Sequence, residues 1–208
     1  MPLVLHKHLP PDLQIAVWKI EESLETLHQM IDWTFEDEKE WQSFKSTPRQ
    51  KEWLCIRALL QKITGQIAKI EYDVFGKPFL KNYTGSFSIT HCQNYAAIAF
   101  SPTHSVGIDI EKYSDQVLKI VPRFLNAQEL NVLKKSKLAY PELLAWCAKE
   151  VLFKIYGKGQ VEFKIDLALI FEEDQLVGRI HKENPPIKVR FHFEYQPDFL
   201  LVYGMVIS

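Results

Sequence analysis

Hydrophobic and polar residues alternate along both ends of the chain. Residues 2–9 and 14–22 show this alternation on either side of Pro10-Pro11, which predicts two strands around a turn. The alternation returns after Val161 in four segments, at residues 167–173, 175–182, 185–195 and 199–208. Because successive side chains of a strand point to opposite faces, these segments are expected to form strands that bury one face.

A helical period replaces the alternation in the first half of the chain. A short helix is predicted at residues 23–31. A stronger helix begins at Thr47, with Pro48 at its first position and Gln50 as a capping-box residue, and ends at Gly65. Its apolar residues recur at helical spacing, at Trp53, Ile56, Leu60 and Ile63.

The second half contains two more helical segments. Asn126 and Glu129 form a capping box that predicts a short helix. Residues 141–157 predict a full helix, which Gly157 ends and which has Lys154 near its C-terminus. Its apolar stripe is expected to face a core.

Strands and turns fill the middle of the chain, in four segments at residues 70–80, 85–91, 95–101 and 105–113. Each half of the chain thus combines helices with several strands, which indicates an α+β fold. The halves have ordinary domain size, so two similar lobes are possible, although no sequence repeat relates them and the idea depends on element order alone.

Composition limits the class of protein further. The 208 residues are 47% hydrophobic and 25% charged, with a net charge of −1, which is typical of a soluble globular chain and argues against broad nucleic-acid binding. Three cysteines without a CxxC spacing indicate reduced thiols in a cytoplasmic protein. No apolar run approaches the roughly 20 residues of a membrane helix, and the N-terminus lacks a signal-peptide pattern.

Two acids, Asp109 and Glu111, stand one residue apart in the apolar segment 105–113. In a strand they would share one face with Gly107, while the apolar residues between them face a core. Two close carboxylates repel one another unless a proton or a cation lies between them. The alternative is a face exposed to solvent, which antiparallel sheets often have.

A third acid, Glu150, lies at the edge of the apolar stripe of the helix at residues 141–157, one turn before Lys154. Three carboxylates from a strand and a helix would suit Mg²⁺, and no His/Cys cluster has the spacing of a zinc site. The alternative for Glu150 and Lys154 is an i,i+4 ion pair on the surface.

Cations and donors for a phosphate ligand are present but scattered. Lys77 lies in a Gly-Lys-Pro turn, Thr90 and His91 end an alternating segment, and Arg49 lies near the start of the helix that begins at Thr47. Each has a structural alternative: a surface turn, a structural histidine, or a solvated helix face. The nucleotide motifs GxxxxGK[ST] and GxGxxG are absent from the sequence.

The order of these motifs resembles the 4′-phosphopantetheinyl transferase superfamily. The resemblance depends on GKP at 76–78, ITHC at 89–92, VGIDIE at 106–111, WCAKEVLFK at 146–154 and GKG at 157–159. The length resembles the monomeric, surfactin-synthetase-activating (Sfp-like) type. Cys92 stands where the family often has serine, and Val151 where it has a small residue. The first 70 and last 50 residues match only in their expected elements.

The resemblance implies a pseudo-dimer of two lobes, each with helices on an antiparallel sheet. Residues 1–104 would contact the nucleotide of coenzyme A, and residues 105–208 would carry the metal-binding acids and the catalytic helix. The protein would act as a monomer and transfer 4′-phosphopantetheine from coenzyme A to a serine of an apo acyl- or peptidyl-carrier protein, releasing 3′,5′-ADP.

The resemblance also implies roles for individual residues. Mg²⁺ would bind Asp109, Glu111 and Glu150, and Lys154 would neutralise phosphate charge. Glu150 would be the general base, directly or through a metal-bound water. The remaining contacts to coenzyme A would come from Arg49, Lys77, Thr90 and His91.

Two other functions stay open: a Mg²⁺-dependent phosphotransferase acting on a small nucleotide, and a non-catalytic coenzyme A-binding protein. For a carrier protein, the expected docking segment is residues 116–126, with Lys119 and Arg123 for charge pairing. It also offers apolar residues, some of which must belong to the core.

Overall fold

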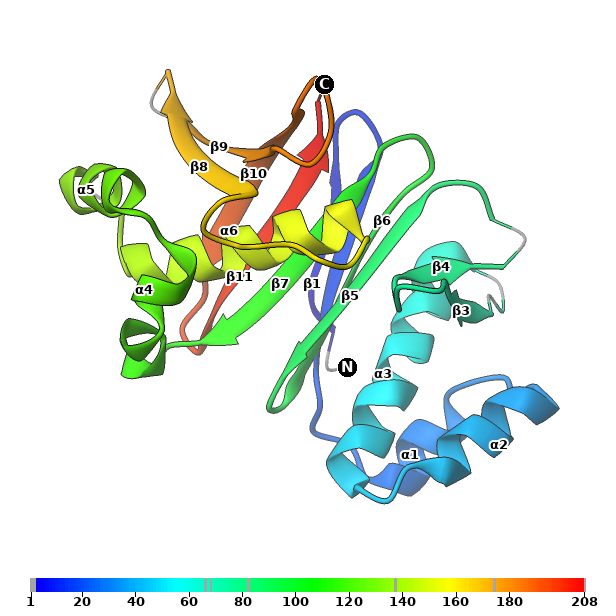
Figure 1. Cartoon of the computed structure of the whole chain (residues 1–208). Helices are drawn as coiled ribbons and strands as arrows, with labels where there is room; N and C mark the ends of the chain where they lie inside the picture. Colours follow the sequence, from blue (N-terminus) through cyan, green and yellow to red (C-terminus); the bar gives the residue numbers. More distant parts are fainter. Residues whose placement is uncertain are drawn as a thin grey trace.

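The computed structural model describes residues 3–65, 67, 69–81, 83–136, 138–173 and 175–207, with only the backbone of Phe35. Within these residues the chain forms two larger antiparallel sheets and a small hairpin, and a long helix covers one face of each larger sheet (Figure 1). This arrangement confirms the α+β prediction.

The first sheet has the strand order β1-β2-β6-β5. Its strands are β1 (Leu3–Leu9), β2 (Leu13–Lys19), β5 (Ser86–Cys92) and β6 (Tyr95–Ser101). The hairpin of β3 (Ile70–Tyr72) and β4 (Pro78–Leu80) contains the predicted Gly-Lys-Pro turn.

The second sheet has the strand order β7-β11-β10-β9-β8. Its strands are β7 (Val106–Lys112), β8 (Leu167–Glu172), β9 (Gln175–Ile180), β10 (Ile187–Tyr195) and β11 (Phe199–Val206). All six strands predicted from alternation at the two ends of the chain are therefore confirmed, and β7 at the edge of this sheet pairs with the C-terminal strand β11.

The helices lie between these strands in the sequence. They are α1 (Leu24–Gln29), α2 (Phe35–Ser43), α3 (Thr47–Thr64), the 3₁₀ helix η1 (Asp115–Lys119), α4 (Val121–Phe124), α5 (Ala127–Lys135) and α6 (Pro141–Tyr156). The helical period of the sequence did not reveal α2, η1 or α4. Within the described chain, no helix is long and apolar enough to cross a membrane.

Helix ends test the predicted caps. The capping box of Asn126 and Glu129 is confirmed, with both hydrogen bonds present at the start of α5. The capping box predicted for α3 is wrong: Ser46 is the N-cap without a side-chain bond, and Gln50 donates to the Phe44 carbonyl instead. This hydrogen bond of Gln50 connects the first turn of α3 to the segment that follows α2.

Three hydrophobic clusters form the core. Helix α3 packs with α1 on the outer face of the first sheet, and α6 packs on the outer face of the second. The third cluster contains residues of β2 and β6 together with residues of β7 and β11. Because this core is shared by the two sheets, the division into lobes at residue 104 stays a prediction.

The two sheets meet along β5 and β7. The hydroxyl oxygens of Ser86 and Ser88 on β5 accept hydrogen bonds from the backbone N–H groups of Val106 and Ile108 on β7, at 3.0 and 3.2 Å. Serine hydroxyl groups thus provide hydrogen-bond acceptors for backbone N–H groups along this edge of β7. This junction places the side chains of β5 beside the acid-bearing strand.

Candidate active site

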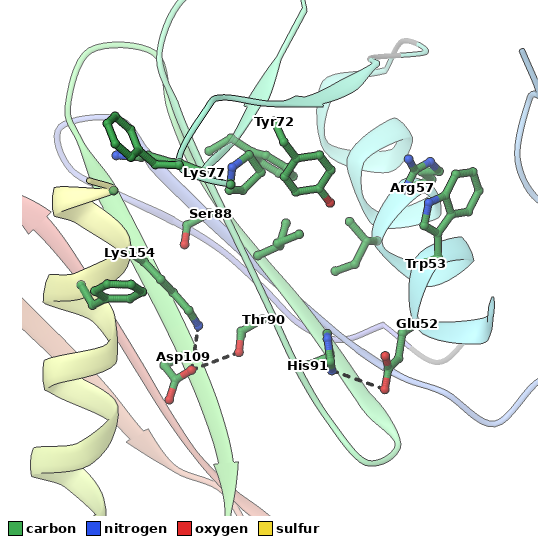
Figure 2. A pocket seen from close by; sticks show the side chains of 18 of the residues that line it. Glu52, Trp53, Arg57, Tyr72, Lys77, Ser88, Thr90, His91, Asp109 and Lys154 are labelled. Carbon is green, nitrogen blue, oxygen red and sulfur yellow. Dashed lines mark hydrogen bonds and ion pairs between the residues drawn. The ribbon is translucent and has the colours of Figure 1, made fainter. Parts of the chain in front are cut away.

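A cavity of about 460 Å³ lies between α3 and the C-terminal end of α6, with β5 crossing between them (Figure 2). Charged and polar side chains from both halves of the chain line it together with aromatic ones. The charged and histidine side chains in its lining are Arg49, Glu52, Arg57, Lys77, His91, Asp109, Lys154 and Lys158. Five of these eight are lysine or arginine, so the cavity suits an anionic ligand.

Asp109 lies at the α6 end of this cavity and is 5% exposed. Its Oδ1 accepts hydrogen bonds from Thr90 Oγ1 at 3.1 Å and from Lys154 Nζ at 2.7 Å (Figure 2). Its Oδ2 is buried and has no hydrogen-bond partner among the described residues. A buried carboxylate oxygen without a partner is costly, which makes it a candidate ligand position.

Helix α6 lies directly on the acid-bearing face of β7. A Cβ added to Gly107 would lie 2.6 Å from the carbonyl oxygen of Val151, so only glycine permits this approach. The group that the glycine accommodates is therefore the backbone of α6. A solvent-exposed face, the alternative for Asp109 and Glu111, is wrong for Asp109 and only partly true of Glu111.

The three predicted metal ligands influence one another. Burial first, and then the charge of Asp109, raises the pKa of Glu111, and the same two causes raise the pKa of Glu150 to about 7. Such shifts follow when carboxylates are buried near one another without a compensating cation. Glu111 and Glu150 lie outside the cavity lining, and the described residues contain no set of three His, Cys, Asp or Glu side chains arranged to hold an ion.

Lys154 is directed toward β7. Its Nζ donates to the Ile108 carbonyl at 2.8 Å and to Asp109 Oδ1 at 2.7 Å. Its ion pair is therefore with Asp109, and the alternative of a surface pair with Glu150 is wrong.

Arg49 and His91 meet at the α3 side of the cavity. Arg49 Nη1 lies 3.0 Å from His91 Nε2, and Glu52 pairs with both, at 3.4 Å from Arg49 and 3.3 Å from His91 Nδ1. Strand β5 alternates, so His91 points toward α3 whereas Thr90 points toward β7 (Figure 2). Thr90 and His91, although adjacent in the sequence, therefore contact opposite sides of the cavity.

Lys77 connects the β3–β4 hairpin to the end of α6. Its Nζ donates to the Ile155 carbonyl at 2.6 Å, and a Cβ added to Gly157 would lie 2.2 Å from Lys77 Cδ. Burial lowers the pKa of Lys77. The lysine lines the cavity while it caps the helix, so its contact with a phosphate stays a prediction.

Sequence reasoning missed part of the cavity wall. Glu52, Arg57, Tyr72 and Lys158 line it as well. Arg57 is 7% exposed and pairs with acids of α2, a helix that the hydrophobic period did not reveal. For Glu52 and Arg57 the available signal was their helical spacing from Arg49. Residues three or four positions apart lie on the same face of a helix, and Glu52 and Arg57 follow Arg49 at three and at twice four positions.

Comparison with known proteins finds a match to the part of the chain that carries the acids. The sequence model of the 4′-phosphopantetheinyl transferase superfamily matches residues 105–202, which include β7, α6 and β11. These residues, just under half of the chain, are therefore similar to that superfamily.

Two curated proteins are also similar to the chain. The chain is 34% identical over 137 residues to the 4′-phosphopantetheinyl transferase gsp of Aneurinibacillus migulanus, which covers 62% of the chain and 53% of that protein. It is 24% identical over 170 residues to the L-aminoadipate-semialdehyde dehydrogenase-phosphopantetheinyl transferase of Xenopus laevis, which covers 67% of the chain and 55% of that protein. The chain thus spans about half the length of the curated relatives it matches.

Proposed function

We propose that the protein transfers the 4′-phosphopantetheine group of coenzyme A to a serine hydroxyl of an apo carrier protein and releases 3′,5′-ADP. The observation that carries the proposal is Asp109, whose buried Oδ2 lacks a partner at the α6 end of a cation-lined cavity. The similarity of residues 105–202 to the 4′-phosphopantetheinyl transferase superfamily supports the same reaction class.

The cavity lining supports a ligand with separated anionic groups. Lys154 supplies a cation beside Asp109, and Arg49 supplies another on α3. Aromatic and apolar side chains between them, including Tyr72, Phe75 and Ile89, offer surfaces for a planar base. Coenzyme A combines these features, since it carries a pyrophosphate, a 3′-phosphate and an adenine.

The donor chemistry at the acidic end fits Mg²⁺. The orphaned Oδ2 of Asp109 and the raised pKa values of Glu111 and Glu150 indicate a group of carboxylates whose charge Lys154 alone does not compensate. These three residues would hold the ion, which would neutralise charge on the pyrophosphate. Thr90 and Lys154 fix the orientation of Asp109 through their hydrogen bonds to its other oxygen.

In the reaction the serine oxygen attacks the phosphorus that carries the pantetheine arm. The new P–O bond forms as the bond to the bridging pyrophosphate oxygen breaks, and that electron pair leaves with 3′,5′-ADP. Glu150 would accept the serine proton, directly or through a bound water, and Lys154 would stabilise charge on the phosphate oxygens. Catalysis is therefore mainly electrostatic positioning.

Mass spectrometry of apo carrier proteins incubated with the enzyme and coenzyme A tests the proposal. We expect a mass gain of one phosphopantetheine group on the carrier serine, with equimolar 3′,5′-ADP, when Mg²⁺ is present. Chelator should abolish the gain, and a carrier with its serine changed to alanine is the matched control.

The alternatives give different results in the same experiment. Turnover of coenzyme A without any carrier protein would favour a small-molecule phosphotransferase. Binding of coenzyme A without any turnover, across fatty-acid, polyketide, peptide-synthetase and lysine-pathway carriers, would favour a binding protein. Full transfer in excess chelator would remove the metal from the proposal.

A further inference from the structure

Glu52 is an acid in a cavity that otherwise suits an anion. Its side chain is 13% exposed and lies on α3 between Arg49 and His91. An acid in this position repels an incoming phosphate and competes with it for Arg49. Its contacts to both neighbours indicate a role that offsets this repulsion.

The contact with Arg49 determines which nitrogen of His91 carries the proton. A guanidinium group only donates hydrogen bonds, so His91 Nε2, 3.0 Å from Arg49 Nη1, must be the acceptor. The ring proton is then on Nδ1, which faces Glu52 Oε1 at an ion-pairing distance of 3.3 Å. His91 is therefore neutral in the ligand-free protein, with Glu52 setting its orientation.

The charges around His91 agree with a neutral ring. Burial lowers its pKa most, the charges of Arg49 on α3 and Lys154 on α6 lower it further, and the acids Glu52 and Asp109 raise it. The phosphate of a ligand would add another negative charge on the side of Nε2. Such a charge favours the imidazolium form.

A phosphate bound at Arg49 replaces Nε2 as the acceptor for the guanidinium. Nε2 then has a free lone pair beside an anion, and it can take a proton from solvent and donate it to a phosphate oxygen. The resulting imidazolium would lie between two negative groups, the phosphate and Glu52. A charge-assisted hydrogen bond on each side stabilises it.

We propose that Glu52 is a positioning residue that holds His91 so that binding of a phosphate at Arg49 is coupled to uptake of one proton by His91. The inference depends on the proposed function, which supplies coenzyme A and its 3′-phosphate as the ligand. It makes this end of the cavity specific for the 3′-phosphate and makes that specificity stronger as the pH falls.

Calorimetry with coenzyme A and 3′-dephospho-coenzyme A tests this role. Titrations at pH 6.5 and 8 in two buffers of different ionisation enthalpy give both the affinity and the number of protons bound. The proteins are the wild type, Glu52→Gln, and Glu38→Gln as a matched control on the exposed surface of α2. The second ionisation of the phosphate, with a pKa of about 6, affects all three proteins alike and cancels in their comparison.

We expect wild type and Glu38→Gln to take up more protons with coenzyme A than Glu52→Gln does. In Glu52→Gln the affinity ratio of coenzyme A to its dephospho form should fall about tenfold at pH 6.5, the effect of losing one charged hydrogen bond. Glu52→Asp should recover part of this ratio. A fold merely loosened by the substitution would weaken both ligands and leave the ratio unchanged.

Two results would overturn the role of Glu52 while leaving the proposed function intact. Tighter binding of coenzyme A to Glu52→Gln would mean that Glu52 only competes for Arg49. Equal proton uptake by wild type and Glu52→Gln would mean that Glu52 does not control the protonation of His91. Failure of wild type to bind either ligand would instead contradict the proposed function itself, and this inference with it.

Discussion

Helix α6 carries two lysines, five residues apart, that pair with acids in opposite ways. Lys149 is 0% exposed and pairs with Glu129, which is 4% exposed. Lys154 pairs with Asp109, which is 5% exposed. Both ammonium groups also donate to backbone carbonyls. The two pairs differ in whether the acid is fully satisfied.

Lys149 and Glu129 form all their hydrogen bonds with other groups of the protein. Lys149 Nζ donates to the carbonyls of Phe124 and Phe163 at 2.6 and 2.8 Å, and lies 2.9 Å from Glu129 Oε1. The Glu129 carboxylate also accepts backbone N–H bonds from Asn126 and Leu169, both at 2.9 Å. This pair joins α4, α5, α6 and β8, so it is a structural centre.

The Lys154 pair leaves one acceptor open. Oδ1 of Asp109 is satisfied by Thr90 and Lys154, but Oδ2 has no partner in the described part of the chain. Two further acids, Glu111 and Glu150, lie near enough for the charge of Asp109 to raise their pKa values. The fully satisfied pair has the contacts of a structural ion pair, whereas the orphaned oxygen of Asp109 leaves an acceptor available to the proposed ligand.

Removal of Lys149 should have the largest effect on stability. Lys149→Met leaves Glu129 buried without a cation and two carbonyls without a donor, which costs about 3–5 kcal/mol. The melting temperature should fall by about 6–20 °C, measured by calorimetry in chelator. The exposed Lys135→Met is the control and should shift it little. A Lys149→Met protein that melts like wild type would break the comparison.

Removal of Asp109 should affect activity and leave the fold intact. Asp109→Ala removes the repulsion with Glu111 and Glu150 but also the acceptor of Lys154 and Thr90, and because these effects oppose one another the melting temperature should stay within about 2–4 °C of wild type, which is about 1 kcal/mol. Transfer should fall at least 100-fold, about 2.7 kcal/mol of transition-state stabilisation. Carrier modification by mass spectrometry measures this, and substantial activity in the variant would contradict the assigned role.

Glu150 should make the ligand-free protein less stable at high pH. Its pKa is raised to about 7 in the folded protein, so its stabilising contribution is complete below the unfolded value of 4.5 and is lost as the pH rises to about 7. Glu150→Gln should therefore be more stable than wild type at pH 8, by on the order of 1–3 kcal/mol. At pH 4.5 the two should be equal.

Urea denaturation in chelator at both pH values measures this difference. If wild type and Glu150→Gln differ equally at pH 4.5 and pH 8, the glutamate titrates normally, and the cluster around Asp109 contains less repulsion than the structure indicates.

The smallest expected effect concerns cations that have no acid partner. Lys119 and Arg123 are exposed and form no ion pair with any described residue, and Leu118 beside them is 49% exposed. Of the apolar residues in the docking segment, Phe124 and Leu125 are core, at 1% and 3% exposed. The surface available to a carrier protein is thus smaller than the sequence indicates.

Lys119→Glu combined with Arg123→Glu should raise the KM for the carrier severalfold, about 1 kcal/mol. It should also flatten the salt dependence of that KM, because exposed charges act mainly on association. Coenzyme A binding should not change. Carrier kinetics that match wild type at both low and high salt would place the docking surface elsewhere.

Local patterns predicted the elements that carry the chemistry. Alternation identified β7 with Asp109 and Glu111 on one face, and helical spacing with a closing glycine identified α6 with Glu150 and Lys154. The same patterns could not reveal α2, because its nine residues are mostly polar and helical period reports only a buried apolar face. That helix begins at the N-cap Thr34 and is tied to α3 by Arg57.

The sequence by itself determined which residues share a strand or helix face, because the periods of two and 3.6 are properties of the local backbone. Only the tertiary structure decided what those faces meet. It placed α6 on Gly107, which buries Asp109, and it placed Glu52 against His91, 39 residues away in the sequence. Such contacts depend on the packing of elements distant in the chain, and that packing determines which charges are compensated and which are left for a ligand.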